Sequence, residues 1–288
     1  MNETDITIRL ARTRADVDAC VVLQRVVWGL ADLEIASAIQ IIATTHAGGM
    51  IHVAETSACQ LVGFAYALPA LRGGVPHLHS DMLAVVPEYQ GRGIGGRLKW
   101  AQREEALGRG VALITWTYDP FQARNAHLNL RRLGAVAEEF LEDFYGVTSS
   151  SLHHGLPTDR LLVRWELNHE RVRERVKEGE PPPMVEAPPS PRVNDVKWQS
   201  GWPVSSEPRL DLDAKELLLE IPPEWDVLCQ AAPRMAEDWH SKVRRALRAY
   251  FSRGYKGVNL LPTQEGGRPG SPGGRRRPLY VLRKAAGR

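Results

Sequence analysis

Residues 82–99 constrain the fold and the chemistry of this chain more than any other stretch. An apolar run stops at Pro87, four glycines follow at positions 91, 93, 95 and 96, and a helical pattern then begins. The first turn of a helix has backbone N–H groups without partners and carries the positive end of the helix dipole. Glycines let an anion approach the backbone closely. The order of strand, glycine-rich turn and helix therefore predicts a site for a phosphate or pyrophosphate group, with Arg92 and Arg97 adding positive charge.

Two common phosphate-binding loops do not fit this segment. The P-loop pattern Gly-x-x-x-x-Gly-Lys-Ser/Thr is not met, because Lys99 lies too far along and is followed by Trp100. The dinucleotide fingerprint requires an acidic residue at the end of a second strand, and the predicted strand at 112–116 is followed by threonine instead. A tight strand-to-helix connection that binds no ligand stays an alternative.

The segment resembles the acyl-CoA loop of the GNAT (Gcn5-related N-acetyltransferase) superfamily. The family pattern Gln/Arg-x-x-Gly-x-Gly/Ala matches residues 90–95, and the preceding Val-x-Pro-x-Tyr matches residues 85–89. Residues 116–121 and 123–135 further resemble a branch of predicted GNAT acyltransferases that carries a C-terminal extension. The resemblance implies that acetyl-CoA or another acyl-CoA is the co-substrate and that its pyrophosphate is bound by Gln90, Gly91, Arg92, Gly93, Ile94, Gly95 and Gly96.

Bulk composition is that of a soluble globular protein. The chain has 288 residues, of which 43% are hydrophobic and 25% charged, and this length predicts more than one folding unit. A formal net charge of +3 does not favour a nucleic-acid partner. No apolar run approaches membrane-spanning length and the N-terminus lacks the pattern of a secretory signal. Cys20, Cys59 and Cys229 show no metal-binding spacing, so we expect buried free thiols, no metal and a cytoplasmic location.

The predicted elements over residues 6–167 follow the order βααβββαβαββ, which is the order of the GNAT family. The expected fold class is therefore α/β (α+β), with a mixed, splayed central sheet flanked by helices. We expect a GNAT-like domain over residues 1–168 and a charged, proline-rich linker over 169–207. A small α/β unit of unknown role, containing a flexible loop at 266–278, is expected over 208–288; it could dock on the first domain or pair with a second copy of the chain as a homodimer.

The resemblance also implies where the acyl group would lie. Enzymes of the family splay two parallel strands and hold the pantetheine arm of CoA between them, and here these strands are 77–86 and 112–117. Backbone N–H groups of the first strand then bind the thioester carbonyl and stabilise the developing oxyanion. By position in the motif, the thioester would lie beside Leu83, Ala84 and Val85.

Three ionisable side chains alternate along the first of these strands. His77, His79 and Asp81 would share one face of a regular strand, with Met82 on the other. A histidine titrates near neutrality and can take the proton of an attacking amine, directly or through a water. Family members that use a strand carboxylate as base carry it on or beside position 79. We therefore expect His79 to be the base, with Asp81 as its orienting partner or as an alternative base; a polar strand face without a catalytic role is the competing interpretation.

The acid that protonates the leaving thiolate is harder to place. The family often has a tyrosine four residues before a Gly-Phe pair; the equivalent pair here is Gly134-Ala135, which puts Leu130 at the tyrosine position. Tyr118 could replace it, a water could, or the thiolate could leave unassisted. The family also often has an asparagine on this helix that bonds the pantetheine or acyl group. Asn125 is the candidate, and a regular helix would place it one turn from Asn129 on the same face.

Two functions from different classes fit these features. The first is an N-acyltransferase that moves the acyl group of an acyl-CoA to the amine of a small molecule or amino acid, by direct attack in a ternary complex. The second is a non-catalytic CoA-binding or regulatory module whose C-terminal unit binds a partner.

Overall fold

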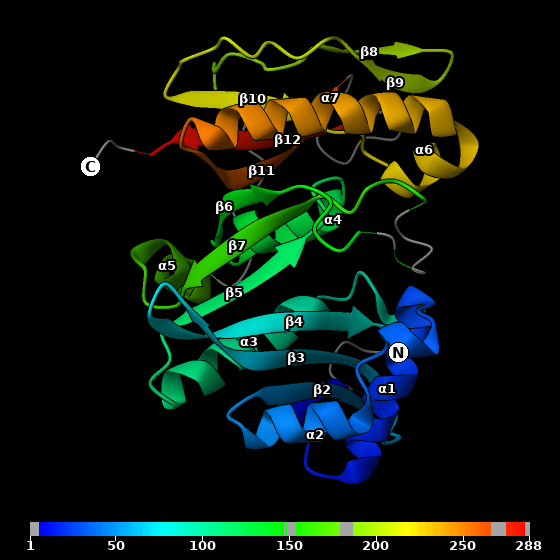
Figure 1. Ribbon diagram of the computed structural model, residues 1–288, viewed down its shortest axis with the longest axis vertical. Coiled ribbons are helices and arrows are strands. Elements are labelled where there is room, and N and C mark those ends of the chain that lie inside the picture. The colour runs from blue at the N-terminus through cyan, green and yellow to red at the C-terminus, as the bar shows by residue number, and fades with distance from the viewer. Residues whose placement is uncertain (1–5, 147, 149–153, 179–186, 266–274, 286–288) are drawn as a thin grey trace. The chain divides into compact units, whose positions relative to one another are not determined.

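The computed structural model of the chain describes residues 6–146, 148, 154–178, 187–265 and 275–285 (Figure 1). The chain divides into two compact units. Unit 1 comprises Met1–Trp116 with the short segments Thr148–Leu152 and Glu166–Asn168. Unit 2 comprises Thr117–Val147, His153–Trp165 and His169–Arg288. The fold class is α+β, with mostly antiparallel strands and flanking helices, as expected.

Unit 1 contains the first three helices and the first four strands, with the start of a fifth. In chain order these are β1 (Ile6–Leu10), α1 (Arg14–Trp28), a 3₁₀ turn (Asp32–Glu34), α2 (Ala38–His46), β2 (Met50–Thr56), β3 (Leu61–Arg72), β4 (Val75–Val85), a 3₁₀ turn (Pro87–Tyr89), α3 (Ile94–Gly108) and β5 (Leu113–Tyr118). The predicted strands 77–86 and 112–117 agree with β4 and β5 to within two residues.

The strands of unit 1 lie in the order β1-β2-β3-β4-β5. All neighbours are antiparallel except β4 and β5, which are parallel. One face of the sheet packs on α1 and α2 through a cluster that includes Cys20, Ile41 and Phe64. The other face packs on α3 through Ala65 and Leu98. The sheet is therefore covered on both faces, and α3, which follows the glycine turn, is held against the core along its length.

Unit 2 contains the remaining elements. They are α4 (Ala123–Ala126), a π-helical turn (His127–Arg132), β6 (Val136–Leu141), β7 (Arg160–Glu166), α5 (Glu170–Glu178), β8 (Val196–Gln199), β9 (Trp202–Ser205), β10 (Glu216–Glu220), α6 (Trp225–Ala231), α7 (Pro233–Ser252), β11 (Tyr255–Glu265) and β12 (Arg275–Lys284).

In unit 2 the strand order is β7-β6-β11-β12-β10. The strand β11 therefore lies beside β6, although more than a hundred residues separate them in the sequence, and Gly257 pairs with Ala137 at their contact. A Cβ atom at position 257 would lie 3.1 Å from Cβ of Ala137, so glycine permits this close approach. Helix α7 buries an apolar stripe that includes Trp239, Val243 and Leu247.

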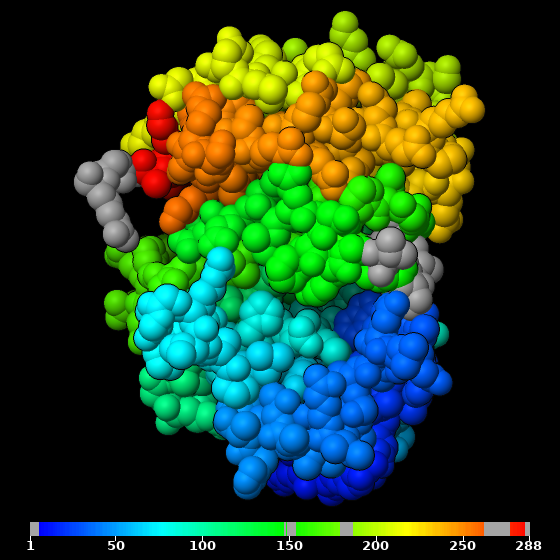
Figure 2. Space-filling view, in the orientation of Figure 1, coloured from blue at the N-terminus to red at the C-terminus, as the bar shows by residue number. Residues whose placement is uncertain are grey.

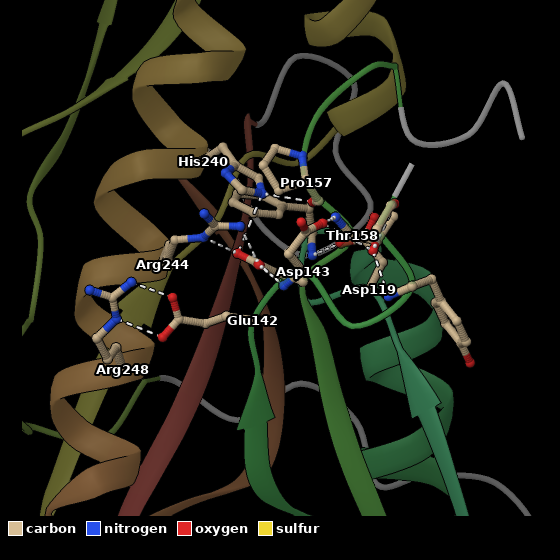
Figure 3. A network of polar contacts seen from close by, with 12 residues as sticks. Asp119, Glu142, Asp143, Pro157, Thr158, His240, Arg244 and Arg248 are labelled. Atoms are coloured by element: carbon tan, nitrogen blue, oxygen red, sulfur yellow. Dashed lines mark hydrogen bonds and ion pairs between the residues drawn. The ribbon is translucent and has the colours of Figure 1, made fainter. Parts of the chain in front are cut away.

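A network of charged side chains joins α7 to the β6–β7 region of unit 2 (Figure 3). The carboxylate of Asp159 is almost fully buried and accepts two hydrogen bonds from Arg244, at 2.7 and 2.5 Å. Nε2 of His240 lies 3.4 Å from the same carboxylate. One turn further along α7, Arg248 donates to Glu142. The buried carboxylate of Asp159 therefore meets the positive charge of Arg244.

The predicted linker is more structured than expected. Pro191 and Val193 form backbone hydrogen bonds with Leu218 of β10, and Val193 is fully buried. The hairpin β8–β9 lies within residues 169–207, where no strands were predicted, because its four-residue strands are too short to show a clear alternation. Residues 179–186, with the prolines at 181–183, lie outside the described residues.

Three further expectations concern a loop, the cysteines and the domain boundary. Of the predicted loop 266–278, residues 266–274 lie outside the described residues, and the rest belongs to β12. Cys20 and Cys229 are buried free thiols, as expected, but Cys59 is exposed in the turn between β2 and β3. The division of the chain between Trp116 and Thr117 differs from the domain boundary predicted near residue 168, which stays a prediction.

Helices α1 and α2, which are blue in Figure 2, expose several apolar side chains. These side chains are Val22, Val26, Ile39 and Ile42. Within the described part of the chain, no single helix meets the length and hydropathy of a membrane span. The segments Arg14–Trp28 and Asp32–His46 meet them only together, as a pair bent by 120°.

Candidate functional site

The glycine turn has the backbone geometry that its sequence predicts. Gly91 and Gly93 have φ angles of 78° and 76°, which lie in the left-handed region that side chains with a Cβ rarely adopt. No atom lies within 4 Å of the place where a Cβ would be at either position, so the backbone is open on that side. Gly93 is the N-cap of α3 and provides no side chain to cap it. The turn therefore leaves room for a ligand against bare backbone.

The first helical hydrogen bond of α3 runs from N of Arg97 to O of Gly93, at 3.1 Å. The N–H groups of Ile94, Gly95 and Gly96 precede that ladder, which is the arrangement that binds anions at helix starts. Gln90 and Arg92 stabilise the turn itself. Nε2 of Gln90 donates to O of Val85 at 2.9 Å, and Arg92 donates to O of Glu88 at 2.9 Å while lying over the ring of Tyr89.

The ladder between β4 and β5 is short. It comprises the pairs Leu78–Ile114 and His79–Thr115 and, in the described residues, extends no further. On its other side β4 stays paired with β3 as far as Val85. The backbone of Leu83, Ala84 and Val85, where the thioester is expected, therefore lies beyond the last pair with β5. This matches the expected splay of the two parallel strands.

The polar face of β4 differs from the prediction at one point. Leu68 pairs with His79 and Tyr66 pairs with Met82, so one residue of β3 between these pairs lies opposite two residues of β4. This β-bulge interrupts the alternation and puts Met82 on the same face as His79, where it packs on the cluster below α1 and α2. The expectation that Met82 faces away from the histidines was therefore wrong. His77 and His79 precede the bulge and do share a face, whereas Asp81 lies in the bulge itself and is exposed.

Burial shifts the titration of several groups around β4 towards their neutral forms. It lowers the pKa of His79 to about 4, and the nearby charges of His77 and Lys99 act in the same direction. Crowding by protein atoms raises the pKa of the Asp81 carboxyl, although part of that residue is accessible to water. His79 is therefore neutral at pH 7, the state in which an imidazole can accept a proton.

Sequence reasoning did not single out Lys99 or Thr115. Lys99 on α3 is 2% exposed, and its ammonium nitrogen lies 3.7 Å from the ring centroid of Trp116. Burial lowers the pKa of this lysine well below its usual value. Oγ1 of Thr115 lies 2.9 Å from Nδ1 of His79. A signal for Lys99 was available, because position 99 adjoins the buried stripe of Leu98 and Gln102 on α3.

Two predicted site residues belong to unit 2. Tyr118 is 3% exposed, and its hydroxyl lies 3.2 Å from that of Tyr280, which also contacts O of Pro120 at 2.8 Å. Burial raises the pKa of Tyr118, so its phenol stays protonated, as an acid must be before it acts. Asn125 is exposed on α4. Its predicted alignment with Asn129 fails, because the π-helical turn that begins at His127 changes the periodicity and Asn129 is buried.

Two other features do not add to this site. A cavity of about 530 Å³ lies in unit 1 between β1, β2 and the last turns of α3, at the opposite end of α3 from the glycine turn; its lining includes His52, Glu104 and Arg109. Among the described residues, no group of three or more His, Cys, Asp or Glu side chains is placed to hold a metal ion.

The sequence profile of a family described as an acetyltransferase (GNAT) domain matches residues 47–134. No curated protein matches the chain. Solved structures similar to it include the ribosomal-protein-S18-alanine N-acetyltransferase of Escherichia coli, which is 18% identical with a TM-score of 0.45; the similarity covers 57% of this chain and 95% of that chain.

Two further structures are similar to the same extent. The protein yncA of Salmonella typhimurium, determined with its cofactor acetyl-CoA, is 20% identical over 58% of this chain and 96% of its own, with a TM-score of 0.46. A spermidine/spermine N-acetyltransferase of Vibrio cholerae is 15% identical over 62% of this chain and 99% of its own, with a TM-score of 0.45.

The family match runs from the start of β2 to the end of the π-helical turn, and it includes β4, the glycine turn and α3. The strand, glycine turn and helix that the sequence predicted all lie within this matched segment. Residues 47–134 of the chain are therefore an acetyltransferase domain of the GNAT superfamily.

Proposed function

We propose that the chain is an acyl-CoA-dependent N-acyltransferase that moves an acyl group, with acetyl the first candidate, to the amine of a small molecule or amino acid. One observation carries this proposal. The parallel β4–β5 ladder ends at His79, and only eight residues after β4 the glycine turn opens into α3. A thioester site and an anion site would thus lie on one continuous stretch of backbone in unit 1.

The donor would be held mainly by backbone groups. The N–H groups from Gly91 to Gly96 suit the pyrophosphate, because the helix start supplies partial positive charge. The strand beyond His79 suits the amide-rich pantetheine arm, which can hydrogen-bond a strand that has no neighbour on one side. An N–H group of Leu83, Ala84 or Val85 would stabilise the oxyanion that forms when the amine attacks.

His79 would take the proton from the attacking amine. In the transfer, the amine nitrogen bonds to the acyl carbon, the carbon–sulfur bond breaks, and the products are an amide and free CoA thiol. The proton lost by the amine passes to His79, and the leaving thiolate takes a proton from water. The neutral state of His79 at pH 7 supports this role, and Asp81 is the alternative base.

A second function is supported by one observation. Leu130 is fully buried at the position where the family often has a tyrosine, and Tyr118 is enclosed beside Tyr280. A chain that had lost its general acid could bind CoA without catalysing transfer, and its C-terminal region would then bind a partner.

The two functions are separated by mixing the protein with acetyl-CoA and a panel of amines and polyamines while free thiol is followed. Thiol release that depends on the amine supports the transferase. CoA binding measured by calorimetry, without turnover on any amine, supports the binding module.

His79→Ala tests the assigned base. Loss of one acid–base group costs about a hundredfold in turnover, and the affinity for CoA should change little because the phosphate contacts lie on the glycine turn. The acidic limb of kcat against pH should lie near 4, following the lowered pKa of His79, and should vanish in the variant. The exposed His46 on α2 provides the control, as His46→Ala. Wild-type turnover in His79→Ala would exclude His79 as the base.

A further inference from the structure

The ring of His79 is held by one side chain on the neighbouring strand. Nδ1 of His79 lies 2.9 Å from Oγ1 of Thr115, and the two residues are partners in the last pair of the β4–β5 ladder. Thr115 is 8% exposed, so this contact is largely shielded from water. Threonine is β-branched and has few rotamers on a strand, which fixes the position of its hydroxyl. The ring orientation is therefore set at the point where the strands part.

A neutral imidazole has one nitrogen that donates and one that accepts, and the partner of one nitrogen decides the state of the other. If Nδ1 carries the proton, Nε2 has a lone pair and can take a proton from an amine. If Nε2 carries it, that nitrogen can only donate. A hydroxyl partner permits either state, so the direction of the His79–Thr115 hydrogen bond decides whether His79 can be a base at Nε2.

We propose, on the basis of the function proposed above, that Thr115 is a positioning residue whose hydroxyl accepts the Nδ1–H of His79 and so keeps Nε2 as the proton acceptor for the attacking amine.

The preceding histidine on β4 shows the same use of Nδ1. Nδ1 of His77 lies 2.9 Å from the backbone O of Val75. A carbonyl oxygen only accepts, so Nδ1 of His77 is the donor. Both histidine rings on this face of β4 thus form a hydrogen bond through Nδ1. The partner of His77 is a backbone oxygen, whereas the partner of His79 is a side chain, which a substitution can remove. The charged or titratable groups that act on His79 are His77 on β4 and Lys99 on α3, and neither is changed by a substitution at Thr115.

The inference is tested with two variants of the full chain, Thr115→Val and Thr115→Ser. Valine has the shape of threonine without the hydroxyl, and serine keeps the hydroxyl. The first readout is the ring ¹⁵N chemical shift of His79 by NMR, assigned with His79→Gln. We expect an Nδ1-protonated ring in the wild type and in Thr115→Ser, and a loss of that state in Thr115→Val. An Nε2-protonated ring in the wild type, or an unchanged ring in Thr115→Val, would overturn the proposal whether or not the protein turns over any amine.

The second readout is kinetic. Thr115→Val should lower kcat about tenfold or more with an unchanged CoA affinity, should move the acidic limb of the pH profile, and should be largely rescued by serine. Added to His79→Ala, it should cause no further loss, because Thr115 acts only through His79. If kcat falls in His79→Ala but not in Thr115→Val, Thr115 is not a positioning residue, while His79 is still supported as the base. If His79→Ala keeps full activity, the assigned base is wrong, while the NMR readout still decides the direction of the hydrogen bond.

Discussion

The buried ionisable groups around β4 in unit 1 differ from the buried ion pair of Asp159 and Arg244 in unit 2. Around β4 in unit 1, burial is the largest influence on His79, Asp81 and Lys99, and it favours the neutral form of each. In unit 2, the hydrogen bond to Asp159 raises the pKa of Arg244 and outweighs its burial. The pair at Asp159 therefore keeps its charges and ties α7 to its neighbours. Burial beside an opposite charge favours the charged form and a structural link, whereas burial without one favours the neutral form.

The largest effect is expected from removing the C-terminal region. A chain ending at Asn168 is the direct test of the domain boundary predicted near that residue, and a cooperative melt would support the boundary. The contacts within unit 2 favour the opposite result, because the truncation leaves the buried carboxylate of Asp159 without Arg244 and the ring of Phe121 without Trp225, on which it stacks at 4.0 Å. We expect an insoluble or non-cooperative product, measured by sedimentation and by thermal unfolding.

Breaking the pair at Asp159 should have the next largest effect. Loss of one partner from a buried ion pair costs about 3–5 kcal/mol, so Asp159→Ala should lower the free energy of unfolding by that order in urea titrations. The matched control is Glu142→Ala, which removes the exposed partner of Arg248 and should cost about 0–1 kcal/mol. Neither variant should alter CoA affinity. Equal losses of unfolding free energy in the two variants would mean that the buried ion pair contributes no more to stability than the exposed one.

A pH effect is expected from His52, a buried residue of unit 1. Burial lowers its pKa to about 4 from an ordinary 6.5. Below pH 6.5 His52 binds a proton in the unfolded chain but stays neutral in the folded chain. The free energy of unfolding should therefore fall as the pH drops from about 6.5 to 4. The contribution of this histidine is about 3 kcal/mol at most. His52→Gln should make this fall in stability shallower without abolishing it, because burial lowers the pKa of His79 to about 4 as well. His46→Gln, at an exposed position, is the control for the substitution itself.

The smallest of these effects concerns the glycine turn. Gly93→Val forces a β-branched residue into a left-handed conformation at the N-cap of α3 and should weaken CoA binding at least tenfold, which is about 1.4 kcal/mol. Gly108→Ala, at the exposed far end of α3 and without a positive φ, provides the control. If a folded Gly93→Val variant binds CoA with unchanged affinity, the pyrophosphate does not bind at this turn.

The parts of the fold and of the site that depend on local sequence could be predicted. The glycine turn, the strand before it and the helix after it are adjacent in the chain, so the spacing of their residues in the sequence was enough to predict them. Features that depend on pairing between distant segments could not be predicted. The bulge that turns Met82 follows from the register with β3, and the contact of Thr115 with His79 follows from the register with β5. The π-helical turn that separates Asn125 from Asn129 leaves no clear mark in the hydrophobic pattern.

The position of β11 beside β6 has a consequence for how the protein is made. A strand edge that is not yet paired can bind another chain. Ribosomes add roughly 5–20 residues per second, so the segment between β6 and the end of β11 takes on the order of ten seconds to synthesise. During that interval the nascent chain has β6 without its later neighbour. Chaperone demand in the cell should therefore be concentrated in this window of translation, and slower codons between β7 and β11 should increase aggregation although the finished protein is unchanged.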